Sequence, residues 1–76
     1  MLTKSRNRNA EMAFEMATRL VTKEQFADKD YLNELWEKCH EDKAVLEAVN
    51  LYLASSSSYA SKALNKLNTE LERLVA

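Results

Sequence analysis

The sequence predicts an all-α fold, a small helical bundle in which two shorter N-terminal helices pack on one long C-terminal helix. The first observation is that its 76 residues contain neither Gly nor Pro. Glycine supplies the positive φ angles of tight turns and β-hairpins, so its absence disfavours sheet folds and glycine-rich nucleotide loops. The second is that residues 43–75 contain no helix breaker and repeat leucine at seven-residue intervals. This spacing places side chains along one side of an α-helix.

The size of the chain limits how the fold is held together. A chain this short forms a single domain and buries only about 60% of the surface that it exposes when unfolded. Below roughly 70–80 residues, most stable folds add a disulfide, a metal, a partner chain or very regular helix packing. Cys39 is the single cysteine, which excludes an internal disulfide and indicates a reducing compartment. We therefore expect good helical packing, a partner chain, or both.

Charge is distributed unevenly along the sequence. Residues 1–22 carry four basic and two acidic side chains, residues 23–47 carry four lysines and eight acids, and residues 50–76 carry three basic and two acidic side chains. The middle of the chain is therefore acidic, and its start is mildly basic. No apolar run approaches the roughly 20 residues of a membrane span and no secretory leader is visible, so we expect a cytoplasmic protein without a membrane partner.

The first eight residues are predicted to be a basic arm that precedes a single helical domain over residues 9–76. Three basic side chains lie in this arm, Lys4, Arg6 and Arg8. The helix dipole disfavours such side chains in a first turn, whereas it favours an acid such as Glu11 there. Asn9 is a suitable N-cap, and a start at Ser5 is the alternative. The apolar spacing then predicts a helix over about 9–22.

Polar residues that cap helix N-termini delimit the next helix. The sequence TKEQ at 22–25 fits a capping box, in which the first and last side chains bond each other's backbone. Asp28 or Asp30 then caps a second helix over about 30–41, and Asp42 can cap the helix that follows. The core-facing side of this second helix is predicted to consist of Tyr31, Leu32, Leu35, Trp36 and Cys39.

The C-terminal stretch is predicted to be one continuous helix over about 43–75, with a break at Ser55–Ser58 as the alternative. Serine costs only about half a kilocalorie per mole relative to alanine inside a helix, although its side chain can bond nearby backbone groups and bend the chain. The leucine repeat keeps its phase across the serines. A loop has no reason to preserve that phase, which favours continuity.

The stripe on this long helix exceeds what two short helices cover, so we expect a homo-oligomer, with a dimer favoured. Small or apolar residues such as Val49 and Ala63 stand beside the stripe, where a two-stranded coiled coil usually carries Glu and Lys. This width is typical of a bundle of three or more helices. The predicted oligomer interface consists of Leu53, Ala60, Leu64, Leu67, Leu71 and Leu74.

The signals for catalysis or metal binding are weak. Glu37 and His40 form the Glu-x-x-His pattern of di-metal bundles. At about 100° per residue, however, Glu37 points away from the apolar stripe and His40 lies at its edge. Cys39 lies on the stripe, where a free cysteine packs as a small hydrophobe, and activation would need a nearby base. We therefore expect a protein that is not an enzyme and that holds no metal or cofactor.

The acidic side of the second helix is the favoured binding surface. Its carboxylates recur at i, i+3 and i+7 opposite the apolar stripe, which is typical of a solvated face but also suits docking of a basic partner. An aromatic residue at the edge of a stripe is a frequent interface anchor. We therefore predict a non-enzymatic interaction module, such as a small adaptor, inhibitor, antitoxin, immunity or phage-accessory factor. The predicted partner-binding residues are Glu34, Trp36, Glu37 and Glu41.

Two further hypotheses remain open. A small oligomeric nucleic-acid-binding regulator would use the basic arm, because short arms with Lys4, Arg6 and Arg8 can enter a minor groove. Dedicated nucleic-acid binders usually have a strongly basic domain, whereas the formal net charge of this chain is −1. The third hypothesis is a small-molecule pocket where the Ala- and Ser-rich segment 54–63 leaves space between helices.

Overall fold

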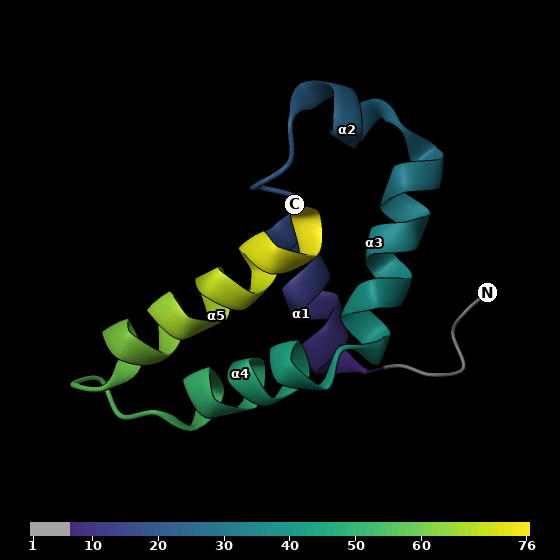
Figure 1. Ribbon diagram of the computed structural model, residues 1–76. Coiled ribbons are helices and arrows are strands. Elements are labelled where there is room, and N and C mark those ends of the chain that lie inside the picture. Colours follow the sequence, from purple (N-terminus) through teal and green to yellow (C-terminus); the bar gives the residue numbers. More distant parts are fainter. Residues whose placement is uncertain (1–6) are drawn as a thin grey trace.

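A computed structural model describes residues 7–76 of the protein, and these residues form helices with no strand among them (Figure 1). The all-α prediction is confirmed. Figure 1 shows α4 and α5 folded back on each other, α3 rising beside them, and α2 at the far end of α3. The helix α1 packs against α3, α4 and α5 and so occupies the middle of the bundle. The five helices of the described part are α1 (Arg8–Ala17), α2 (Lys23–Ala27), α3 (Lys29–Glu41), α4 (Lys43–Ala54) and α5 (Ala60–Val75).

Polar side chains begin the first four of these helices, because each accepts a hydrogen bond from an otherwise unsatisfied N–H of the first turn. The Asn7 side chain begins α1 in this way, Asp28 begins α3, and Asp42 begins α4. At α2 the capping box is complete. The Gln25 N–H donates to Thr22 Oγ1 at 3.1 Å, and the Thr22 N–H donates to Gln25 Oε1 at 3.0 Å. The predicted caps at the starts of α2, α3 and α4 are therefore confirmed.

The first helix differs from its prediction at both ends. Asn9 is not the cap but lies inside α1, where its side-chain amide donates to Asn50 Oδ1 on α4 at 3.1 Å. The helix ends at Ala17 rather than near residue 22. The Thr18 hydroxyl donates to the Glu15 carbonyl at 2.7 Å, and the chain then turns toward the extended cap at Thr22. Most of the predicted basic arm, including Lys4 and Arg6, lies outside the described residues.

The prediction of one helix over 43–75 is wrong, because the chain turns back at the serine run. The Ser55 hydroxyl donates to the Leu51 carbonyl at 2.6 Å, a local bond that competes with continuation of the helix. The backbone then leaves the helix and re-enters one at Ala60, so that α4 and α5 lie side by side as a hairpin. This return buries the apolar sides of both helices within one chain, which a straight rod cannot do.

The leucine repeat also fails to keep its role across the turn. In α4 the residues facing the core are Val45, Ala48 and Val49, whereas Leu46 and Leu53 lie about 100° around the helix. Leu53 is consequently 58% exposed, and Leu46 is half-buried. In α5 the repeat does face inward. The seven-residue repeat keeps its phase across the serines in the sequence, but in the structure it does not form one buried face over α4 and α5.

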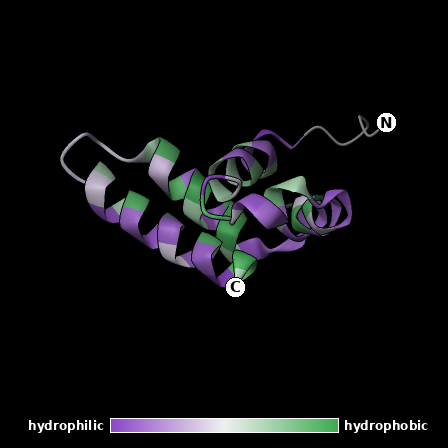
Figure 2. Ribbon diagram, turned by 90° about the horizontal axis from the view of Figure 1, so that it is seen from above, coloured by the Kyte–Doolittle hydropathy of each residue, from purple (hydrophilic) through white to green (hydrophobic). Residues whose placement is uncertain are grey.

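The core is small and rich in alanine. Figure 2 shows the hydrophobic segments directed mainly toward the middle of the molecule and the hydrophilic ones toward its outside. Alanines on α1 permit close approach of the three helices around it, since small side chains shorten the distance between backbones. Within residues 7–76 no polar side chain is buried. The buried residues are Ala10, Ala13, Ala17, Leu35, Cys39, Val45, Ala48, Val49, Ala63, Leu67, Leu71 and Leu74.

Asp42 connects the start of α4 to α5. Its Oδ1 accepts from the Val45 N–H at 3.0 Å and from Arg73 Nη2 at 3.0 Å, while Arg73 also pairs with Glu70 at 2.8 Å. The hydrogen bond from Arg73 is the main reason that the pKa of Asp42 lies below its usual value. The backbone N–H of Val45 acts in the same direction, and partial burial opposes both.

Replacing Asp42 with alanine is expected to lower the free energy of unfolding by about 1–2 kcal/mol at neutral pH, the usual effect of losing an N-cap. Because the pKa of Asp42 is lower in the folded state, the stabilisation exists above the unfolded pKa and disappears as the pH falls through the folded value. Urea denaturation of both proteins at neutral pH and in acid measures this difference. The gap between wild type and Asp42→Ala should shrink below about pH 4.

Asp42→Asn is the matched control, because asparagine still caps a helix but carries no charge to pair with Arg73. It should retain most of the neutral-pH stability and lose the acid dependence contributed by position 42. A gap between wild type and Asp42→Ala that stays constant from neutral pH into acid would contradict the role of the ionised carboxylate.

Candidate partner-binding surface

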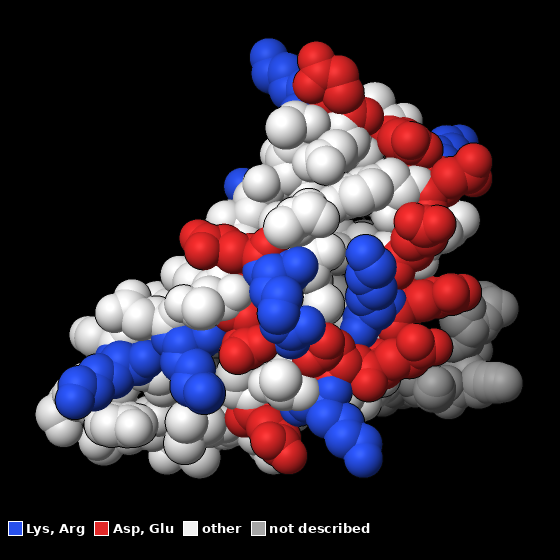
Figure 3. Space-filling model, viewed as in Figure 1, with Lys and Arg blue, Asp and Glu red and all other residues white. Residues whose placement is uncertain are grey.

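Three carboxylates form what we call the acidic stripe of α3, namely Glu34, Glu37 and Glu41. All three are exposed, and they lie on the side of α3 opposite Leu35 and Cys39, which face the core. Figure 3 shows acidic side chains gathered along the edge of the molecule that α3 forms. Both ion pairs found among residues 7–76 belong to Arg73, so none of the three carboxylates is neutralised by a described partner.

The negative charge is concentrated on α3 and its two caps. Between Asp28 and Asp42 the sequence carries six carboxylates and two lysines. The neighbouring α1 carries Arg8 against Glu11 and Glu15, a net charge of −1 compared with −4 over residues 28–42. An excess of positive charge on α1 would weaken the negative electrostatic potential around α3, but α1 carries no such excess. A basic partner is therefore attracted to α3 rather than to α1.

Trp36 lies on another side of α3, about 100° around the helix from Glu37, and packs in the seam between α3 and α1. It is half-buried, and its ring meets Phe14 of α1 edge-on, with centroids 5.1 Å apart and an interplanar angle of 84°. The His40 ring lies 4.3 Å from the indole, and His40 Nδ1 is 2.8 Å from the Trp36 carbonyl oxygen. These contacts hold the indole in place, which reduces the entropy that it would lose on contact with a partner.

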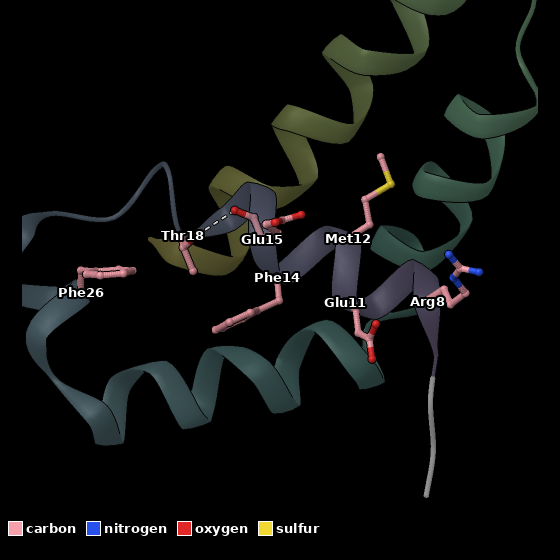
Figure 4. A pocket seen from close by; sticks show the side chains of 7 residues that line it. All are labelled: Arg8, Glu11, Met12, Phe14, Glu15, Thr18 and Phe26. Atoms are coloured by element: carbon pink, nitrogen blue, oxygen red, sulfur yellow. Dashed lines mark hydrogen bonds between the residues drawn. The ribbon is translucent and has the colours of Figure 1, made fainter. Parts of the chain in front are cut away.

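A shallow open groove of about 600 Å³ continues from Phe14 toward α2 (Figure 4). Figure 4 shows Phe26 reaching from α2 toward α1, and Phe14 reaching from α1 toward α3. Phe26 is 57% exposed, because α2 packs against α3 rather than against α1. The sequence does not reveal this groove, since it depends on how far α2 stands from α1. The lining residues are Arg8, Glu11, Met12, Phe14, Glu15, Thr18 and Phe26.

The structure thus brings the predicted partner-binding residues together on one helix, although on two adjacent faces. The acidic stripe faces solvent, and Trp36 lies about 100° around the helix from Glu37. Of the predicted nucleic-acid residues, Lys4 and Arg6 lie outside the described residues. Arg8 is the exposed first residue of α1 and lines the groove beside Glu11.

The predicted oligomer interface requires a correction. Leu67, Leu71 and Leu74 are buried in the core of a single chain, because α5 folds back onto α4, and they are not available to a second copy. Ala60 and Leu64 are half-buried on the same helix. Of the six predicted positions, Leu53 is the one that is largely exposed.

Cys39 and His40 show no arrangement for catalysis. Burial raises the pKa of the Cys39 thiol to about 11, and the negative charge of Asp42 adds to the rise. A thiol with a raised pKa is a poor nucleophile at neutral pH.

No group of three or more His, Cys, Asp and Glu side chains within residues 7–76 is placed to hold a metal ion. In the same part of the chain, none of the helices has the length and apolar content needed to cross a membrane.

Comparison with known proteins assigns no family, because no protein-family model, curated protein or solved structure matches the chain.

Proposed function

We propose that this protein is a non-enzymatic interaction module that binds a basic partner protein through α3. The contact residues are the acidic stripe, Glu34, Glu37 and Glu41, together with Trp36. One observation carries the proposal. Three exposed carboxylates without a described ion pair lie along one face of α3, and the same helix carries, on another face, an aromatic side chain that is held in place but not fully covered.

The physical roles of the two parts differ. Unpaired carboxylates on one face accelerate the encounter with a positively charged surface and disfavour acidic partners. The indole supplies apolar contact area, which contributes more to affinity than exposed ion pairs do. Arginine suits both parts, since its guanidinium pairs with carboxylates and stacks on aromatic rings. The partner surface is thus expected to present arginine or lysine beside an apolar contact, as the target of a small adaptor or inhibitor would.

Reversing the charge of the stripe is expected to abolish partner binding without unfolding the helix. The variant carries Glu34→Lys, Glu37→Lys and Glu41→Lys, and it should lose the proteins that the wild type captures from a lysate of the source organism. For a partner identified in this way, the dissociation constant of the variant should be about tenfold higher or more, mainly through slower association. The dissociation constant of the wild type should depend strongly on salt, because salt screens the attraction between the stripe and the partner. Calorimetry or surface plasmon resonance measures both quantities.

A control variant with the same change in net charge separates the stripe from the overall charge. It reverses three exposed glutamates on other helices, Glu24→Lys, Glu47→Lys and Glu72→Lys. This control should retain the partner, and circular dichroism should show the same helicity for all three proteins. Equal loss of binding in both variants would contradict a specific role for α3. A salt-dependent DNA mobility shift that vanishes when Lys4, Arg6 and Arg8 become alanine would instead support the nucleic-acid hypothesis.

A further inference from the structure

The end of the α4–α5 hairpin has a composition unlike the rest of the chain. Residues 48–61, which we call the hairpin end, contain no charged side chain, although 23 of the 76 residues in the whole sequence are charged. The segment comprises the last turns of α4, the serine run and the start of α5. It forms the tip at the left of Figure 1, away from α3.

Large apolar side chains are exposed on this uncharged tip. Leu51 is 41% exposed, Leu53 is 58% exposed and Tyr59 is 46% exposed. The outward face of the last turn of α4 is completed by Asn50 and Ala54, which are also exposed. Leu51 and Leu53 lie about 160° apart around α4, with Asn50 and Ala54 between them on its outer side. Leu51, Leu53 and Tyr59 are three of the five large hydrophobic residues that are exposed in residues 7–76.

We propose that the hairpin end is the surface through which two copies of this chain associate. A two-fold contact is self-complementary, because the same surface patch of each copy meets that of the other. An uncharged patch matches a second uncharged patch, which another copy of the chain supplies, and it has no charge to select a basic or acidic partner. The serine hydroxyls and the Tyr59 hydroxyl supply donors and acceptors for the rim of such a contact.

The composition of the core favours a second copy that stays bound. Five of the twelve buried residues are alanine, and the single cysteine is buried and free. A domain of this size with no disulfide, and with no metal-binding group in its described part, gains stability most readily from a partner chain. Association of identical chains buries apolar surface at every copy, without depending on the abundance of another protein.

The helix faces beside the hairpin end extend the contact area. A stable interface buries about 800 Å² on each partner, more than a single helical turn presents. Leu46 lies two turns before Leu53 on the same side of α4 and is half-buried. The α4 part of the leucine repeat, which the core does not use, therefore continues the apolar surface along that helix. This inference goes beyond the proposed function, because it concerns a different surface and a different partner.

Sedimentation equilibrium or light scattering across micromolar to millimolar concentrations tests the proposal. The wild type is expected to approach twice the mass of one chain. Leu53→Lys should weaken the association by about tenfold or more, because it removes a leucine that the contact between copies would bury and places a charge there. Tyr59→Lys is the second variant and should weaken it as well. Circular dichroism should show that both variants retain the helicity of the wild type, since both positions are largely exposed.

Phe26→Lys is the matched control, because Phe26 is as exposed as Leu53 but lies on α2, outside the hairpin. This variant should associate as the wild type does. Three results would overturn the proposal: a wild type that remains monomeric at millimolar concentration, an association that Leu53→Lys and Tyr59→Lys leave unchanged, or an association that Phe26→Lys disrupts while they do not. The last result would place the contact at the groove between α1 and α2.

Discussion

Replacing Leu67 with alanine is expected to lower the free energy of unfolding by about 2–5 kcal/mol. Leu67 is completely buried, and it belongs to the side of α5 that packs against the core. The loss includes the transfer free energy of the removed carbons and the cost of the cavity that they leave. A domain of this size has a total stability of roughly 4–11 kcal/mol, so the variant should be partly unfolded at moderate temperature. Urea denaturation followed by circular dichroism measures the change.

Leu53→Ala is the informative comparison, because Leu53 and Leu67 occupy equivalent positions of the seven-residue repeat. In the hairpin, however, Leu53 is 58% exposed, and the substitution should change the free energy of unfolding by less than about 0.5 kcal/mol. The denaturation is measured at low protein concentration, so that self-association contributes little to the free energy of unfolding. Equal effects at the two positions would contradict the hairpin and support a continuous helix.

Cys39 is expected to react with a thiol reagent at least about a hundredfold more slowly than an exposed cysteine. The side chain is completely buried, and burial raises its pKa to about 11. At about pH 8 such a thiol is ionised in roughly one molecule in a thousand, compared with roughly one in four for an ordinary cysteine. The reagent also needs an opening of the core before it can reach the sulfur. The rate of labelling by a chromogenic disulfide measures the combined effect.

A second thiol in the same molecule provides the control for this measurement. Asn33 is exposed on α3, so Asn33→Cys should label rapidly while Cys39 labels slowly. In strong denaturant the two thiols should react at similar rates, because burial no longer distinguishes them. Similar rates in the native protein would show that Cys39 is accessible, and would contradict the packing of α3 against α1.

The two proposed binding surfaces lie on different parts of the fold and differ in chemistry. The acidic stripe and Trp36 are on α3, whereas the hairpin end contains no charged residue at all. The two proposals together predict that one chain binds a second copy and a basic partner at the same time. Charge reversal on α3 should leave the mass in solution unchanged, and Leu53→Lys should leave the charge-dependent contact on α3 intact.

Local interactions determined the parts of the structure that the sequence predicts well. The capping box at Thr22, the cap at Asp42 and the inward position of Cys39 each depend on residues within a few positions along the chain. The same holds for the outward position of the acidic stripe, since the faces of an isolated helix follow from its spacing alone. The composition without Gly or Pro was sufficient to predict the all-α class.

Tertiary packing decided whether the C-terminal stretch is a rod or a hairpin, and with it which leucines are buried. Four serines weaken a helix by only about 2 kcal/mol in total, too little to settle the choice by themselves. Folding α5 back onto α4 buries Leu67, Leu71 and Leu74 within one chain, and each such side chain contributes about 1.5–3 kcal/mol. The position of α2, and therefore the groove beside Phe26, likewise follows from packing between distant segments. Burial of this kind depends on the whole arrangement of helices, and no periodicity within a single segment encodes it.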